Sequence, residues 1–301
     1  MDVKHLQLLR ELADRGSVTA VAAATHRTVS AVSQQLRTAQ RTAGMQLVSP
    51  HGRGVRLTEA GWLLAAGGAE LNEVLATVQA RWDAYRNDPG GQVNIAAFPS
   101  AATLVFPQVL NAATRAGLDV RLTDIDPAES EFASLTADFD IVIAHSLDSP
   151  APVGSDGLAV RRLVAEPLDI AMSSSHHLAS PPSLCSADVA DQTWIGVPEG
   201  YPFDTVLTSI ARNLGTPLDV VQRVRDNRLI ESIVAGSNHL AVLPRFTTRA
   251  NGGLVLRPIT DVPAVRYMSA IMRRDRAQRR AVQTLLTTIV SAADSAAAQA
   301  P

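Results

Sequence analysis

Hydrogen-bonding and basic side chains recur on one face of a segment near the start of the chain. Val29, Val32 and Leu36 lie at helical spacing between residues 29 and 43, which predicts an amphipathic helix. The opposite face carries hydroxyl, amide and guanidinium groups, which bind polar or anionic partners through hydrogen bonds rather than break bonds. These groups belong to Ser30, Ser33, Gln34, Arg37 and Arg41, and Thr28 stands just before the helix, where Thr28 or Ser30 can cap it.

Basic charge is concentrated around this segment. Residues 15–58 include six arginines and no Asp or Glu, although the formal net charge of the whole chain is −2. Such asymmetry indicates a polyanionic partner at one end of the chain. A solvated basic face explains the same charge, so charge alone leaves both interpretations open.

Short elements around the segment predict how its polar face is presented. We expect a helix at 3–14, a short helix at 18–24, the helix at 29–43 and two strands at 45–48 and 55–58. Arg53 lies in the glycine-rich tip between the strands, and Arg56 lies in the second strand. This order is that of a winged helix-turn-helix. In that motif the recognition helix, here the one expected at 29–43, enters the major groove of DNA, and a basic hairpin reaches the phosphates or the minor groove.

A long helix is expected next, over residues 59–88. Its apolar residues are separated by three, four or seven positions, and this heptad spacing favours pairing with a second helix in a coiled coil. The alternative is that the same apolar residues pack on their own domain. Gly67-Gly68 predicts a local bend, and residues 87–91 form a linker. The apolar residues of the seam are Leu64, Leu71, Leu75, Val78, Trp82 and Tyr85.

From residue 92 onward, strands and helices alternate, which predicts a mostly parallel sheet covered by helices. The chain is therefore expected to be an α/β multidomain protein. Separate strands are expected at 159–164 and 168–172, and a last helix at 274–293 followed by a frayed tail. Ser100 follows Phe98-Pro99 at a strand-to-helix turn, where its hydroxyl and the helix N-terminal amides can bind an anion, or where it simply caps the helix.

Composition excludes several classes of protein. With 301 residues, 46% of them hydrophobic and 19% charged, the chain is long enough for two or three folded domains. No apolar run approaches about 18 residues, and no export signal precedes the first helix, so a cytoplasmic protein is expected. Cys185 is the single cysteine, and His176-His177 has no third ligand spaced with it, so no metal or cofactor is expected.

Several motifs together resemble LysR-type transcriptional regulators. Ser30–Leu36 (SAVSQQL) followed by Val55–Gly61 (VRLTEAG) is similar to the N-terminal domain of that family, and the resemblance extends over essentially the whole chain. Ile233–Gly236 and Leu240–Pro244 resemble the family's late helix and strand. Ala39-Gln40 departs from the Leu-Glu pair that is usual there.

The resemblance implies a fold and a function for each domain. It implies a winged helix-turn-helix at 1–58, a linker and dimerisation helix at 59–88 and a periplasmic-binding-protein-like α/β effector domain at 92–301. Subdomain I would comprise 92–162 and 265–301, and subdomain II would comprise 163–264. A homodimer or homotetramer would bind inverted-repeat operators in double-stranded DNA, and a small metabolite, for which an organic acid or amino acid is expected, would bind between the subdomains.

Candidate site residues follow from both lines of reasoning. The DNA-binding candidates are Thr28, Ser30, Ser33, Gln34, Arg37, Arg53 and Arg56. The effector-binding candidates are Ser100, Ala101, His145, Pro202 and Phe203. The alternatives are a solute-binding protein or an enzyme on the same α/β fold. The basic N-terminal segment and the lack of a converging catalytic constellation count against them.

Overall fold

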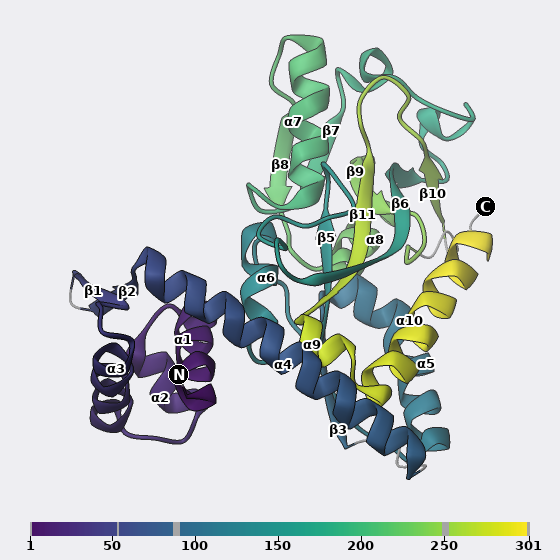
Figure 1. Ribbon diagram of the computed structural model, residues 1–301. Helices are drawn as coiled ribbons and strands as arrows, with labels where there is room; N and C mark the ends of the chain where they lie inside the picture. The colour runs from purple at the N-terminus through teal and green to yellow at the C-terminus, as the bar shows by residue number, and fades with distance from the viewer. Residues whose placement is uncertain (1, 53, 87–90, 249–252, 300–301) are drawn as a thin grey trace.

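A computed structural model describes residues 2–52, 54–86, 91–248 and 253–299. A small helical head lies at one end of a long helix, and a larger α/β body lies along that helix (Figure 1). Within the described residues, no helix is both long enough and apolar enough to cross a lipid bilayer.

Three helices and a two-stranded wing form the head. They are α1 (Val3–Arg15), α2 (Val18–Ala24), α3 (Val29–Ala43), β1 (Val48–His51) and β2 (Gly54–Leu57). Ser17 caps α2 by accepting a hydrogen bond from the amide of Ala20, and Gly16 ends α1 in the left-handed conformation, which costs glycine little. Leu9, Val21 and Val32 pack in a core that fixes the order of the helices.

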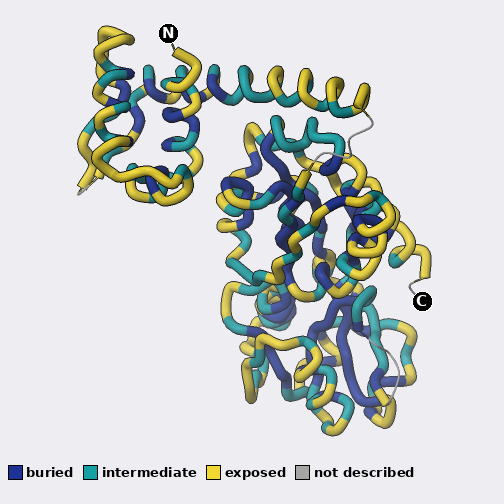
Figure 2. The backbone as a smooth tube through the Cα atoms, turned by 90° about the horizontal axis from the view of Figure 1, so that it is seen from below, coloured by how far each residue is buried: buried dark blue, intermediate teal, exposed yellow. Residues whose placement is uncertain are grey.

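The long helix α4 (Glu59–Tyr85) is continuous through Gly67-Gly68, so the expected bend is absent (Figure 1). Gly68 instead permits close packing, because a Cβ atom there would lie 2.6 Å from the carbonyl oxygen of Leu6 in α1. Leu64 packs on the core of the head, so the first half of α4 faces its own domain. Exposed residues run along the second half (Figure 2).

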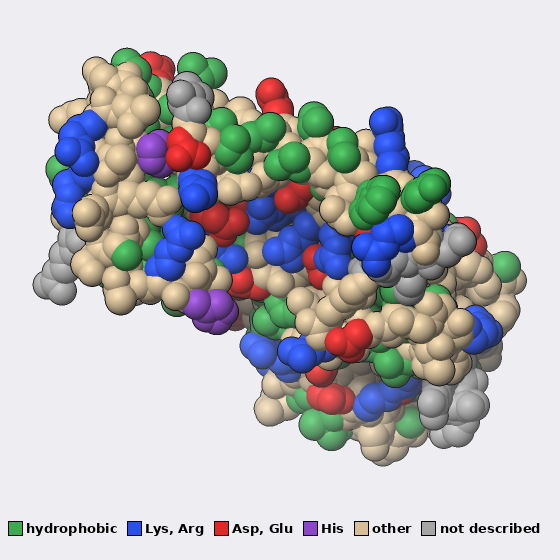
Figure 3. Space-filling model, turned by 60° about the horizontal axis from the view of Figure 1, so that its bottom comes forward, with side chains coloured by type: hydrophobic (Ala, Val, Ile, Leu, Met, Phe, Trp, Pro, Cys, Tyr) green, Lys and Arg blue, Asp and Glu red, His purple; other side chains and the backbone are tan. Residues whose placement is uncertain are grey.

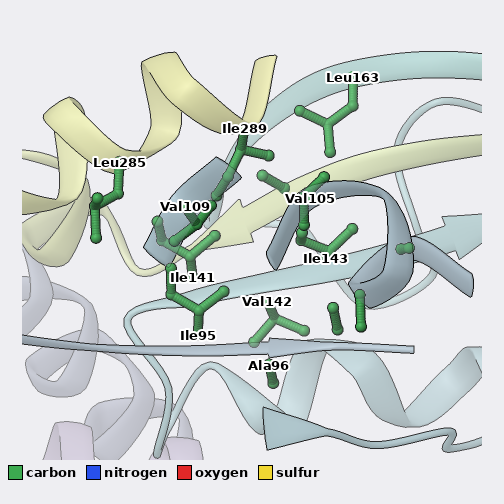
Figure 4. Close-up of a cluster of buried hydrophobic side chains, with 14 of the residues drawn as sticks. Ile95, Ala96, Val105, Val109, Ile141, Val142, Ile143, Leu163, Leu285 and Ile289 are labelled. Carbon is green, nitrogen blue, oxygen red and sulfur yellow. The ribbon is translucent and has the colours of Figure 1, made fainter. Parts of the chain in front are cut away.

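One lobe of the body, subdomain I, is built on a mixed sheet. β3 (Gln92–Ala97) pairs in parallel with β4 (Asp119–Asp124) and β5 (Ile141–Ser146), and β11 (Val265–Met272) pairs antiparallel with β5. The helices α5 (Pro99–Ala116) and α10 (Arg280–Gln299) cover one face, while the short α6 (Phe132–Leu135) also packs on β5. Figure 4 shows Val109, Ile289 and Ile141 meeting in this core. Helix α10 continues to Gln299, beyond the expected frayed end.

The other lobe, subdomain II, has a separate core. Strands β7 (Thr193–Gly196) and β8 (Asp219–Arg223) pair in parallel, and fully buried Trp194 lies among residues of α7 (Pro202–Leu214) and α8 (Asn227–Ala235). Strands β9 (Ala241–Pro244) and β10 (Leu254–Arg257) complete the lobe. Strand β10 has no counterpart among the expected elements.

One strand joins the two lobes. β6 (Ala159–Ser173) is a single strand of 15 residues, where two strands were expected. Its first half pairs with β11 and its second half pairs with β9 and β10. Pro167 does not end the strand, because its carbonyl still accepts a hydrogen bond from the amide of Arg245. The crossing therefore sits at Glu166 and Pro167, opposite the start of β11.

Ion pairs seat the head on the body beside α9 (Arg274–Ala277). Acidic and basic side chains lie side by side at this boundary (Figure 3). The guanidinium groups of Arg10 and Arg273 are almost fully enclosed, so solvent screens these contacts less than ordinary surface pairs. The pairs that cross the boundary are Arg10–Asp275 at 2.9 Å, Arg273–Asp14 at 3.1 Å, Arg273–Glu11 at 3.3 Å and Arg15–Asp138 at 2.8 Å.

Substitution of the two neighbouring glycines of α4 should have opposite effects on stability. Gly68→Ala forces a methyl group against the backbone of Leu6 and should destabilise the fold by about 1–3 kcal/mol. Gly67→Ala meets open space and should stabilise the helix by up to about 1 kcal/mol. Denaturant unfolding of both variants measures the difference, and equal midpoints would contradict the close packing of α1 on α4.

Candidate functional sites

Exposed polar groups lie on α3, on the side of the head away from the body (Figure 1). Gln34 and Arg37 are exposed, and their side chains make no hydrogen bond within the described chain. Thr28 caps α3 by accepting a hydrogen bond from the amide of Ala31, and its hydroxyl lies 3.0 Å from that of Ser30. Ser33 is half-buried on the same helix. The face thus offers an amide and a guanidinium that no group of the described chain occupies.

The wing stands next to this face. Arg56 is exposed on β2, while Arg53 falls outside the described residues. The side-chain oxygen of Gln40, at the end of α3, accepts hydrogen bonds from the amides of Leu47 and Val48 at 3.0 and 3.2 Å. Gln40 therefore ties the wing to α3 at the position where the sequence departs from the family pattern. Basic side chains also gather along the outer edge of the head (Figure 3).

A cavity of about 260 Å³ opens between the two lobes of the body. Its size lies near the lower end for small-molecule sites. Of the expected effector residues, the structure brings Ser100, His145, Pro202 and Phe203 together in its wall. Ala101 is not among the lining residues; its side chain is buried in the core of subdomain I, because adjacent helix residues point in different directions.

Three helices begin at this cavity. Phe98 precedes α5 and Tyr201 precedes α7; both helices have proline in the first turn and no side-chain cap. Asp226 precedes α8 and does cap it, through the amide of Leu229. The free amides of the first turn, together with the helix dipole, favour an anion near α5 and α7.

A buried charge pair lies at the crossing of the lobes, and sequence reasoning missed it. Glu166 on β6 and Arg266 on β11 are cross-strand partners, 0% and 3% exposed. Arg266 donates from Nε to Glu166 at 2.7 Å and from Nη2 to the hydroxyl of Ser100 at 2.8 Å. Its guanidinium carbon lies 4.9 Å from the ring centre of Phe98 and 5.4 Å from that of Phe203. Arg266, the single charged residue of β11, was the available signal.

Two further charges face each other across the cavity. Asp126 follows β4 in subdomain I, and Arg225 follows β8 in subdomain II, over the ring of Tyr201. Burial raises the pKa of Asp126, although Arg225 and Arg266 act in the opposite direction. Asp126 makes no hydrogen bond or ion pair within the described chain, so its carboxylate is free to interact with a molecule in the cavity.

His145 contributes an uncharged imidazole ring to the wall of the cavity. It packs edge to face against Phe98 and Phe132, with ring centres 4.9 and 4.8 Å away, and its Nδ1 is enclosed without a hydrogen-bond partner. Burial, with repulsion from Arg266, lowers the pKa of His145 to about 3. The ring therefore stays uncharged at neutral pH.

Two family models match this chain. The model described as "Bacterial regulatory helix-turn-helix protein, lysR family" matches residues 3–62, and the "LysR substrate binding domain" model matches residues 86–294. A probable nitrogen assimilation transcriptional activator from Synechococcus elongatus is 22% identical, covering 92% of this chain and 90% of its own. The regulator MetR from Salmonella typhimurium is 23% identical, covering 94% and 87%.

Solved structures share the fold. A full-length OxyR variant from Pseudomonas aeruginosa superposes with a TM-score of 0.65 at 18% identity, over 96% of this chain and 94% of its own. Full-length CbnR in complex with its target DNA superposes with a TM-score of 0.52 at 17% identity, over 97% and 100%.

Stability should decrease with acidity because of His145. Its pKa falls from 6.5 in the unfolded chain to about 3 in the fold, so the unfolded state binds the proton first as pH drops below about 6.5. The loss reaches about 2 kcal/mol at pH 5. His145→Phe, which keeps a ring in the aromatic cluster, should flatten this part of the curve. Thermal unfolding of both proteins between pH 7 and 5 tests this, and parallel curves would contradict it.

Proposed function

The chain belongs to the LysR family of transcriptional regulators, and on that premise we propose that it is a sequence-specific DNA-binding regulator controlled by a small anionic metabolite. We assign DNA binding to residues 1–58, dimerisation to 59–88 and effector binding to 92–301. Within the last of these, we place subdomain I at 92–166 and 265–301 and subdomain II at 167–264. The boundary lies four residues beyond the expected one, because Leu163 and Val164 pack in the core of subdomain I. A regulator acts where the chromosome is, so we place it in the cytoplasm.

The unoccupied polar face of α3 supports the DNA-binding role most directly. An exposed amide such as that of Gln34 can pair with the edge of adenine, and an exposed guanidinium such as that of Arg37 can pair with guanine or a phosphate. Arg53 and Arg56 on the wing supply contacts to the backbone or the minor groove. The proposed DNA-binding residues are Thr28, Ser30, Ser33, Gln34, Arg37, Arg53 and Arg56.

The cavity between the lobes supports effector binding. Ser100, His145, Pro202 and Phe203 contribute to it, and the uncapped N-termini of α5 and α7 favour an anion. The modest volume suits an organic acid or an amino acid. The chain passes between the lobes along β6 and at the start of β11. Binding between the lobes can change the angle between them, and with it the position of the head that is seated on subdomain I.

The second half of α4 supports self-association. Val74, Leu75, Val78, Trp82 and Tyr85 are between 50% and 81% exposed, which is unusual for a cluster of large apolar side chains on a free surface. We propose that this stripe pairs with its copy on a second chain to form a homodimer, which can assemble further into a tetramer. A two-fold dimer presents two copies of α3, which suits an inverted-repeat operator.

DNA binding can be measured with the promoter regions nearest the gene against random duplex DNA. The full-length chain should bind a specific site, with affinity falling steeply as salt rises. Gln34→Ala should change preference at one base position by about 1–3 kcal/mol, whereas Arg37→Ala should weaken binding to all sequences. Arg115→Ala, an exposed arginine on α5, serves as the control. Equal affinity for promoters and random DNA would overturn the proposal.

Assembly can be measured by sedimentation with two matched substitutions. Val78→Glu puts a charge into the stripe and should shift the chain toward monomer, because an unpaired charge in an apolar interface is costly. Val221→Glu changes a similarly exposed valine, 47% against 57%, on β8 and should leave assembly unchanged. An unaltered dimer in the Val78 variant would place the interface elsewhere.

A further inference from the structure

Arg266 stands out among the residues of the cavity. Resting on the proposed effector role, we propose that Arg266 binds the effector's carboxylate and sets the specificity of the cavity for singly charged carboxylates. Ser100 is its partner donor in this assignment. The two side chains together, as neighbouring donors, determine that the ligand group is a carboxylate.

One nitrogen of Arg266 remains available. Nε and Nη2 are used by Glu166 and Ser100. Nη1 makes no hydrogen bond within the described chain, and it is not among the polar atoms sealed off inside the protein. Because the residue is only 3% exposed and lines the cavity, the open side of Nη1 is the cavity itself. Nη1 is therefore a donor open to the cavity, where an acceptor on a ligand can replace water and form a charge-assisted hydrogen bond.

Ser100 adds a second donor beside Arg266. Its oxygen accepts from Nη2 of Arg266 at 2.8 Å, which leaves its own O–H to donate, and no described protein group accepts it. Two donors on one wall, beside the free amides at the start of α5, match the two oxygens of a carboxylate. Hydrogen bonds between a guanidinium and a carboxylate are stronger than those between neutral groups.

Contacts around Arg266 hold it in place. Glu166 accepts from the Phe246 amide through its other oxygen at 2.9 Å, so both members of the pair are fixed. The rings of Phe98 and Phe203 lie against the guanidinium from subdomains I and II. The donor is thus set before the ligand arrives, which lowers the cost of binding. The same rings offer an apolar surface for the rest of the ligand.

Charge balance selects among anions. Glu166 already neutralises Arg266, and Asp126 faces the cation of Arg225. Asp226 adds one more carboxylate to the cavity wall. A doubly charged phosphate or dicarboxylate would meet these acids without a matching surplus of cations, whereas one carboxylate needs only the donors described. The observations therefore favour a monocarboxylate with an apolar remainder over a phosphate ester.

The test compares matched probes on the full-length chain. Thermal shift followed by calorimetry would use carboxylates and their amides, from acetate and acetamide to phenylacetate and phenylacetamide, together with phenyl phosphate. At least one carboxylate should bind about tenfold or more tightly than its amide and than phenyl phosphate. Equal binding of acid and amide, preference for the phosphate, or no carboxylate binding would overturn the inference.

Variants then assign the effect to Arg266. Ser100→Ala should weaken the best carboxylate by about tenfold, and Arg266→Met combined with Glu166→Gln by about a hundredfold, while the amide changes little. The double change avoids leaving a buried charge unpaired. Arg115→Met is the control, because Arg115 is exposed on α5 and does not line this cavity. Unchanged carboxylate affinity in both Ser100 and Arg266 variants would overturn the assignment.

Two failures remain distinguishable. Each preparation is also tested for binding to promoter DNA. A chain that binds DNA specifically and ignores carboxylates contradicts only the role of Arg266. A chain that binds carboxylates through Arg266 and shows no preference among DNA sequences contradicts the proposed regulatory function instead.

Discussion

Glu166 and Arg266 form a buried ion pair, and the need to keep them paired constrains how the rest of the body folds. Neither could be buried alone, because a lone charge out of water costs several kcal/mol, on the order of the whole stability of a domain. The register of β6 against β11 must keep them opposite each other, and this register sets where one lobe ends and the next begins. The floor of the cavity is therefore a by-product of strand pairing. Through β11, that floor is also joined to Arg273 and the seat of the head.

Sequence patterns were sufficient where structure is local. The order of helices and wing in the head followed from the spacing of Val29, Val32 and Leu36 and from capping residues such as Ser17, since caps act within a few positions. The strand-to-helix turn at Ser100 was also predicted from the local sequence. The bend expected at Gly67-Gly68 is absent, because Gly68 serves the close approach of Leu6, which is far away in the sequence.

Contacts between residues far apart in the sequence could not be predicted from local patterns. Arg266 finds Glu166 and Ser100, which lie 100 and 166 positions away, and no local pattern links them. Separate strands were expected at 159–164 and 168–172, yet Pro167 lies at the crossing within one continuous strand. Ala101 was placed in the cavity by its neighbour, although the helix turns it into the core.

The ionic seat between α1 and α9 has a consequence for how affinity is interpreted. Potassium chloride added to an electrophoretic mobility titration weakens phosphate contacts on one side of the head. On the other side it weakens Arg10–Asp275 and Arg15–Asp138, to an extent that depends on how well each pair is enclosed. A log–log slope for this protein therefore counts phosphate contacts alone only when the joint between head and body is equally closed in the free and the DNA-bound chain.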